Sequence, residues 1–202
     1  RAVLGIDYAA VAVATARATY ARPNLEFLQL DVHALPDLGR RFDLITNFQV
    51  IEHLADPARF LIAVRGALER DGVLMLTTPN RLTSVSENPV HLHEYTAAEL
   101  RELLRPLFGR VDMCAMVGSE RVRAFDAERA RQVQRILRFD PLGVRHLLPG
   151  WLLHSAFAHL GALVRRRVTG AVVEARAIVP ADFTVVEEER PDALDLVALC
   201  RP

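Results

Sequence analysis

Residues 42–57 read FDLITNFQVIEHLADP and carry the strongest local signal in the chain. The apolar run at 42–48 predicts a buried β-strand. Pro57 directly behind Asp56 is typical of a helix start, with the aspartate as N-cap. An amide, a glutamine, a glutamate and a histidine lie between these two elements. We therefore expect a functional site just beyond the strand.

Strands and helices alternate on both sides of this stretch. Thr96 and Glu99 have the spacing of a capping box, which predicts a further helix start. The predicted strands are 2–6, 24–31, 42–48, 73–79, 110–118 and 193–201, and the predicted helices are 9–21, 56–70 (with a stop at the Asp71–Gly72 pair) and 96–104. Largely apolar strands that alternate with helices are typical of a parallel sheet covered on both faces.

The composition excludes several classes of protein. The chain has 202 residues, 51% of them hydrophobic, which is enough for one main core. Its 25 basic and 25 acidic residues balance, so the charge gives no support for nucleic-acid binding. Every basic residue is Arg, which excludes chemistry that needs a lysine. Cys114 and Cys200 lie far apart, which favours a reducing cytoplasm over a disulfide framework.

The segment 119–168 interrupts the alternation, and it carries ten Arg against four acidic residues. A pair of insertion helices, packed on the sheet edge or over the ligand cleft, is one interpretation. The other is peripheral membrane contact, because apolar helical faces flanked by Arg suit a membrane surface. Pro149 and Gly150 break the most apolar run, so we do not expect a membrane-spanning helix.

Acids and amides follow the predicted strands at their carboxyl ends, where open parallel sheets bind ligands. Asp7 and Asp31 each follow a strand, as do the amides Asn47 and Asn80. An aspartate in this position can accept both hydroxyls of a ribose, although Asp7 would equally serve as the N-cap of the next helix. Asp31, followed by the apolar Val32, could bind an exocyclic amine and pack against an adenine ring.

Five segments together resemble a known family. VLGIDYAAVAVATARA, LEFLQLDVHALP, FDLITNFQVIEHLADP, GVLMLTTPN and HLHEYTAAELRELL resemble successive motifs of class I S-adenosylmethionine-dependent methyltransferases. The resemblance is to the small-molecule branch related to ubiquinone-biosynthesis O-methyltransferases. It covers about the first 118 residues, and ALDLVALCR near the end is similar to the family's last strand.

The resemblance implies an α/β fold: a Rossmann-like three-layer α/β/α sandwich. Its sheet would be mostly parallel with an antiparallel last strand, and a helical insertion would precede that strand. The expected parts are a cofactor-binding core at 1–118, an Arg-rich insertion or lid at 119–180 and a terminal strand region at 181–202. The family's Gly-rich loop, which follows its first strand, is absent from these residues. We therefore expect an N-terminally truncated chain.

The implied cofactor is S-adenosylmethionine, with the ribose held by the first acid and the adenine framed by the second. The residues around the end of the 42–48 strand would line the methionine moiety and the methyl-transfer point. The implied cofactor-binding residues are Asp7, Tyr8, Asp31, Val32, Asn47, Phe48 and Gln49.

The implied reaction is in-line methyl transfer to a small-molecule acceptor, most simply a hydroxyl. A histidine suits removal of the hydroxyl proton because its unperturbed pKa is near neutrality. His53 and His91 are the candidate bases, and Glu52 and His93 are candidate substrate contacts. The histidines at 91 and 93 could instead bond the loop backbone or cap the helix near Thr96. The histidine and glutamate spacing matches no tight ligand pattern, so no metal site is predicted.

Two rival interpretations stay open. A nucleotide-dependent oxidoreductase would also use Asp7 for a ribose, although a Tyr/Lys catalytic pair cannot exist in a chain without Lys. A non-catalytic Rossmann-like domain could use the Arg-rich segment to bind a membrane or a protein. The Ala-rich, all-Arg composition indicates a bacterium. The acceptor could be hydrophobic or anionic, and the sequence predicts no oligomeric state.

Overall fold

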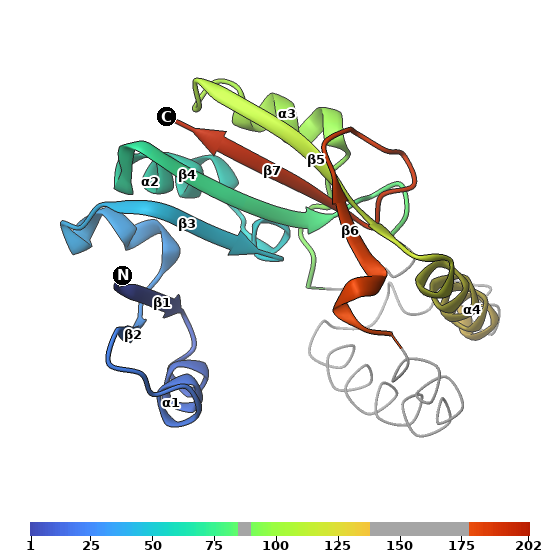
Figure 1. The fold of residues 1–202 in the computed structure, drawn as a ribbon, viewed down its shortest axis with the longest axis horizontal. Coiled ribbons are helices and arrows are strands. Elements are labelled where there is room, and N and C mark those ends of the chain that lie inside the picture. The colour runs from blue at the N-terminus through green and yellow to red at the C-terminus, as the bar shows by residue number, and fades with distance from the viewer. Residues whose placement is uncertain (85–89, 138–177) are drawn as a thin grey trace. The chain divides into compact units, whose positions relative to one another are not determined.

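The computed structural model describes residues 1–84, 90–137 and 178–202, which alternate between strands and helices (Figure 1). In chain order the elements are β1 (Val3–Asp7), α1 (Ala10–Thr19), β2 (Leu25–Gln29), the 3₁₀ helix η1 (Val32–Leu38), β3 (Phe42–Phe48), the 3₁₀ helix η2 (Ile51–His53), α2 (Pro57–Ala67), β4 (Leu68–Pro79), α3 (Ala97–Leu104), β5 (Arg110–Gly118), α4 (Glu120–Leu137), the 3₁₀ helix η4 (Pro180–Asp182), β6 (Phe183–Val186) and β7 (Asp195–Arg201). All six predicted strands and all three predicted helices are confirmed as elements.

The strands of the described residues form two sheets. β1 pairs with β2 in parallel, and a five-stranded sheet has the order β3-β4-β7-β5-β6. β3 and β4 are parallel, whereas β5 and β6 are antiparallel. In Figure 1, β7 runs antiparallel to β4 and β5. The predicted α/β class, with an antiparallel last strand, is therefore confirmed.

The chain divides into two compact units. The first contains 1–77, 98–112 and 198–202, and the second contains 78–97 and 113–197. The boundaries predicted at 118 and 180 stay a prediction. Most of the 119–180 segment lies outside the described residues, which include 119–137 with α4 and 178–180 with the start of η4. Among the described residues, no helix is long and apolar enough to cross a membrane.

The start of α2 follows the local signal in the sequence. Asp56 caps the helix, since its carboxylate accepts a hydrogen bond of 2.9 Å from the backbone N–H of Arg59. Pro57 occupies the first turn, where a missing N–H costs nothing. One face of α2 is apolar and is buried in the first unit together with β4 and α3. The buried side chains of these elements include Phe60, Leu61, Val64, Leu68, Leu74, Leu76, Leu100 and Leu104. Each contributes about 2 kcal/mol by leaving water.

The start of β4 differs from the prediction, because α2 ends at Ala67 and the strand begins at Leu68 rather than at 73. The parallel register to β3 pairs Phe42 with Leu68 and then shifts, so that Leu44 pairs with Val73. The Asp71–Gly72 pair, which was expected to stop the helix, lies within this irregularity of β4. Gly72 is required there, because a Cβ would lie 2.9 Å from the carbonyl oxygen of Phe42.

The expectation that 42–48 is a buried strand is wrong. Along β3 only Asn47 is buried, whereas Leu44 is 56% exposed and Phe48 is 52% exposed. The physical reason is position: among the described residues, β3 is the end strand of its sheet and pairs with β4 alone. Apolar content therefore predicted the strand correctly and its burial incorrectly.

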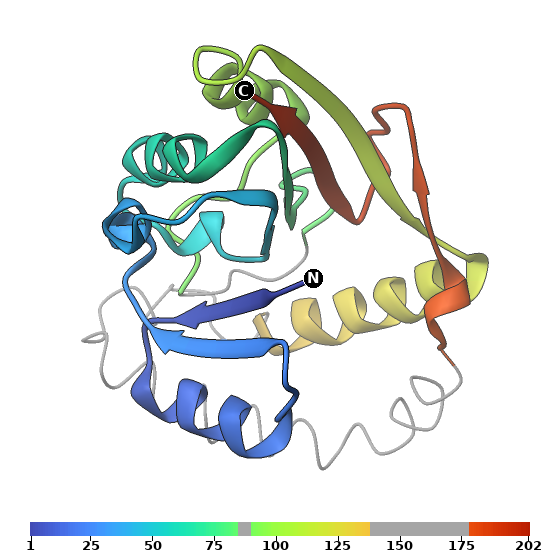
Figure 2. The same cartoon turned by 60° about the vertical axis from the view of Figure 1, so that its left-hand side comes forward.

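The two-stranded sheet is built around one close approach. Gly5 lies opposite Phe27, and a Cβ on this glycine would meet the phenylalanine ring at 2.6 Å. Figure 2 shows α1 lying alongside β1 and β2. Arg17 of this helix donates to the backbone carbonyl of Phe27 with its Nε at 3.0 Å, which ties α1 to the sheet.

The second unit contains a strand that was not predicted. β6 pairs antiparallel with the end of β5, where Ala115 lies opposite Val186 and Gly118 opposite Phe183. Its four residues, FTVV, are rich in β-branched side chains. The strand is too short for periodicity to identify it.

Candidate functional site

Two of the predicted site residues lie at the same end of the two-stranded sheet. Asp7 ends β1 and is opposite Gln29, and Asp31 follows two residues later. The carboxylate of Asp7 accepts from the backbone N–H of Ala9 at 2.8 Å and is exposed. Asp7 thus shapes the turn into α1, while its charge stays at the surface. Tyr8 is 77% exposed beside it.

Asp31 has a partner that the sequence analysis missed. Its Oδ1 accepts from the backbone N–H of His33 at 2.9 Å and lies 2.8 Å from the His33 Nδ1. These hydrogen bonds, the backbone one first, hold the pKa of the Asp31 carboxyl below its usual range. Val32, between them, is half-buried. The i,i+2 spacing of Asp and His after a strand was the available signal for this pair.

Asn47 is the buried amide at the end of β3, only 7% exposed. Among the described residues, no group donates a hydrogen bond to its side-chain oxygen Oδ1. A buried carbonyl oxygen without a donor costs about 1–3 kcal/mol. This arrangement is explained if a ligand supplies the donor.

Gln49 adopts a backbone conformation that is uncommon for a residue other than glycine, with φ of 56°. Its backbone N–H donates to the Thr77 carbonyl at 3.0 Å, and its side-chain Nε2 donates to the Thr77 hydroxyl at 3.3 Å. Thr77 was not predicted to matter. Strained residues of this kind cluster at ligand sites, which supports the prediction for the stretch from Asn47 through Phe48 to Gln49.

Glu52 and His53 belong to the single turn η2 that follows. Glu52 is 1% exposed, and its carboxylate lies 3.9 Å from the His53 Nε2. A buried carboxylate is expensive to desolvate, so it requires polar surroundings. His53 is exposed, so the glutamate predicted to contact substrate is buried while the candidate base is accessible.

His91, His93 and Glu94 lie in the second unit. His91 Nδ1 is 2.6 Å from Glu94 Oε1, and the two side chains are 15% and 16% exposed. His93 is exposed, and its ring contacts Tyr95 edge-on with centroids 4.5 Å apart. His91 therefore has Glu94 as an acidic partner, whereas His93 packs against the ring of Tyr95. The i,i+3 spacing of His91 and Glu94 was the signal for this missed pair.

Asn80, the other strand-end amide, has a structural role. It is 1% exposed, and its Nδ2 donates to the carbonyls of Ala193 at 3.0 Å and Pro191 at 3.4 Å. Its Oδ1 accepts from the backbone N–H of Leu82 at 3.1 Å. These bonds fasten the start of the loop after β4 to the turn before β7.

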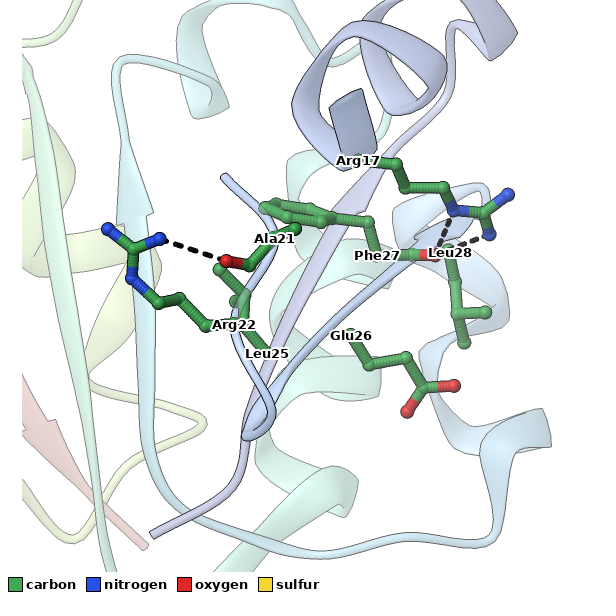
Figure 3. A pocket seen from close by; sticks show the side chains of 7 residues that line it. All are labelled: Arg17, Ala21, Arg22, Leu25, Glu26, Phe27 and Leu28. Carbon is green, nitrogen blue, oxygen red and sulfur yellow. Dashed lines mark hydrogen bonds between the residues drawn. The ribbon is translucent and has the colours of Figure 1, made fainter. Parts of the chain in front are cut away.

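A hollow of about 320 Å³ lies beside α1 and β2 (Figure 3). Its lining includes two cations, but both bond to backbone: Arg17 to Phe27 and Arg22 to Ala21. Glu26 at its rim pairs with Arg40 at 2.7 Å. None of the predicted site residues lines it, and its charged side chains already have hydrogen-bond or ion-pair partners, so it is not the candidate site.

Known proteins resemble the chain in sequence. A family model described as "Methyltransferase domain" matches residues 1–76. A probable S-adenosylmethionine-dependent methyltransferase of Mycobacterium tuberculosis is 32% identical over 215 residues, 98% of this chain and 68% of the relative. A ubiquinone biosynthesis O-methyltransferase of Bartonella quintana is 36% identical over 81 residues, 39% of this chain and 33% of the relative.

The mycobacterial match extends past residue 118, so it includes the Arg-rich segment as well as the motifs. Among solved structures, an S-adenosylmethionine-dependent methyltransferase of Thermotoga maritima has a TM-score of 0.58 at 13% identity, covering 98% of this chain and 72% of that one. That likeness concerns the fold. These matches favour neither the oxidoreductase nor the non-catalytic interpretation.

Proposed function

The chain belongs to the class I S-adenosylmethionine-dependent methyltransferases, and from that premise we propose that it methylates a hydroxyl of a small-molecule acceptor. It is an enzyme whose cofactor is S-adenosylmethionine. The observation that carries the cofactor-binding part of the proposal is the buried Asn47 Oδ1, at the end of β3, which has no donor among the described residues.

The residues at the strand ends fit this cofactor. The cofactor's methionine moiety carries an ammonium group, and a buried amide oxygen such as that of Asn47 is a suitable acceptor for it. The exposed carboxylate of Asp7 suits ribose hydroxyls, with Tyr8 beside the adenosine. Asp31 and Val32 would frame the adenine, and the low pKa of Asp31 keeps its carboxylate ionised. Phe48 and Gln49 would complete the floor under the methionine moiety.

When bound, the cofactor supplies an electrophilic methyl group on sulfur. The protein's task is then to hold the acceptor in line and to exclude water, because the displacement needs no covalent protein intermediate. A hydroxyl acceptor also has to lose its proton, and His53 or His91 is proposed as the base that takes it. Glu52 and His93 are proposed to contact the acceptor.

The acceptor class is the least specific part of the proposal. The Arg-rich segment 119–168 would suit a hydrophobic or anionic acceptor, or a membrane surface from which such a molecule is taken. Much of that segment lies outside the described residues. A cytoplasmic location stays a prediction from the two isolated cysteines.

Calorimetric titration of the full-length protein with S-adenosylmethionine tests the cofactor site. Asp7→Asn keeps an oxygen for the Ala9 N–H but removes the charge, and we expect affinity to fall about tenfold, since a hydrogen bond to a charged group is worth about 1.5–3 kcal/mol. Asp43→Asn, an exposed strand residue, is the matched control. Equal affinity in all three proteins would argue against this assignment.

Transfer of labelled methyl groups to a panel of hydroxylated lipids, phenols and sugar nucleotides tests the reaction. Loss of a general base lowers turnover about a hundredfold or more. We expect His53→Ala or His91→Ala to lower turnover by this amount, with little change in cofactor affinity. Unaltered turnover in both variants would remove them as bases, and methylation of amines alone would contradict O-methylation.

A further inference from the structure

We propose that Glu94 is a positioning residue that fixes the proton on Nδ1 of His91, so that Nε2 is the nitrogen that accepts a proton. This inference rests on the proposed base role of His91 and deepens it. Nothing in the sequence motifs assigns a role to Glu94. The base proposal alone does not say which ring nitrogen of His91 accepts the proton.

The backbone around the pair is anchored at both ends of its loop. Asn80 and Tyr95 form a parallel β-bridge, and the backbone N–H of Arg81 donates to the Tyr95 carbonyl at 2.9 Å. Tyr95 is 5% exposed and directly follows Glu94. The carboxylate therefore extends from a fixed point of the chain, so that little conformational freedom is lost when it meets the histidine.

The contact itself is short and largely shielded from water. Glu94 Oε1 lies 2.6 Å from His91 Nδ1, and each side chain is about 15% exposed. Hydrogen bonds to ionised groups are short and about twice as strong as neutral ones. A carboxylate only accepts hydrogen bonds, so the nitrogen that faces it has to carry the proton. The partner of one ring nitrogen thus sets the protonation of the other.

His33 offers an internal contrast among the described residues. Its Nδ1 also meets a carboxylate, that of Asp31 at 2.8 Å, but its Nε2 lies 3.3 Å from the backbone carbonyl of Asp56. A carbonyl oxygen only accepts hydrogen bonds, so the nitrogen of His33 that faces it acts as the donor. Both ring nitrogens of His33 therefore face acceptors, which makes His33 a poor candidate for a base. In His91 the Glu94 contact fixes Nδ1 as the nitrogen that carries the proton.

Long-range nitrogen–proton correlation spectra of histidine-labelled full-length protein, recorded at mildly alkaline pH, test the proposal directly. A His91→Gln variant identifies the His91 signals. In the wild type we expect the Nδ1–H form, whereas free imidazole side chains favour the Nε2–H form. Glu94→Ala should shift His91 to the Nε2–H form, and Glu94→Gln should largely restore the wild-type pattern, because its amide oxygen still accepts a hydrogen bond.

An Nε2–H form in the wild type, or a pattern unchanged in Glu94→Ala, would overturn the proposal. Glu102→Ala, an exposed glutamate on α3, is the matched control and should leave the spectrum unaltered. Cofactor titration separates this result from the proposed function. We expect Glu94→Ala to bind S-adenosylmethionine within about twofold of the wild type. A wild type that does not bind the cofactor would defeat the proposed function without changing the spectra.

Discussion

Asn47 and Asn80 are two buried amides in equivalent sequence positions, each at the end of a strand that pairs in parallel. Asn80 uses its side-chain oxygen and nitrogen in hydrogen bonds to Leu82, Pro191 and Ala193. Asn47 has a side-chain oxygen with no donor among the described residues. A strand-end position therefore does not assign a ligand role. An amide whose hydrogen bonds are all made within the protein stabilises the fold, whereas a buried amide with an unsatisfied oxygen is a candidate for ligand binding.

Removal of the Asn80 amide is the most direct test of this difference between the two residues. Asn80→Ala leaves the buried carbonyl of Ala193 with one donor fewer and the N–H of Leu82 without its acceptor. We expect the free energy of unfolding to fall by about 3 kcal/mol, measured by urea denaturation. Asn47→Ala should cost less than about 1 kcal/mol, since its oxygen has no donor to lose. Equal losses in the two variants would remove the distinction.

For cofactor affinity we expect the opposite ranking, with a larger effect from the substitution of Asn47 than from that of Asn80. Asn47→Ala should weaken the affinity for S-adenosylmethionine about tenfold, because the ammonium group loses a buried acceptor. Asn47→Asp keeps an acceptor oxygen and should bind at least as well as Asn47→Ala. Calorimetric titration measures both. Wild-type affinity in Asn47→Ala would show that the unpaired oxygen has another explanation.

The sequence predicted those parts of the fold that depend on neighbouring residues. Asp56 and Pro57 mark the start of α2 within one turn, and the structure agrees. The Asn80 network depends on a carbonyl 113 residues away, which no local pattern reveals. The exposure of β3 likewise follows from its place at the end of a sheet. For the site, the strand-end residues were predicted, whereas Glu94 and His33 had only a short spacing as their signal and Thr77 is identified by its contacts alone.

The strained backbone of Gln49 is a second sign that the end of β3 binds a ligand. Gln49→Val should lower the free energy of unfolding by about 1–2 kcal/mol, since a β-branched residue fits a φ of 56° poorly. Gln49→Gly accepts the conformation and should lose less stability, although it also loses the Thr77 contact. Urea denaturation compares the two. A glycine variant less stable than the valine variant would contradict the argument from strain.

Asp182 is a charged counterpart of Asn80, and its substitution should have the smallest effect, a change in how stability depends on pH. Its carboxylate accepts from the Val179 N–H at 2.9 Å and the Ser119 hydroxyl at 2.8 Å, and these bonds, the backbone one first, lower its pKa. A carboxyl with a lowered pKa in the folded state contributes stability above its unfolded pKa of about 3.9 and loses it as the pH falls through the folded value.

The stability of the wild type should accordingly fall more steeply than that of Asp182→Asn as the pH is lowered from about 6 to about 3. At neutral pH the variant should be slightly less stable, because the amide is a weaker acceptor for the same two donors. Asp43→Asn, an exposed residue of β3, should follow the wild-type curve. If the stability of the wild type and of Asp182→Asn changed with pH in parallel, the carboxylate would stabilise the fold no more than a neutral amide does. Asp182 would then resemble Asn80, which stabilises the fold without a charge.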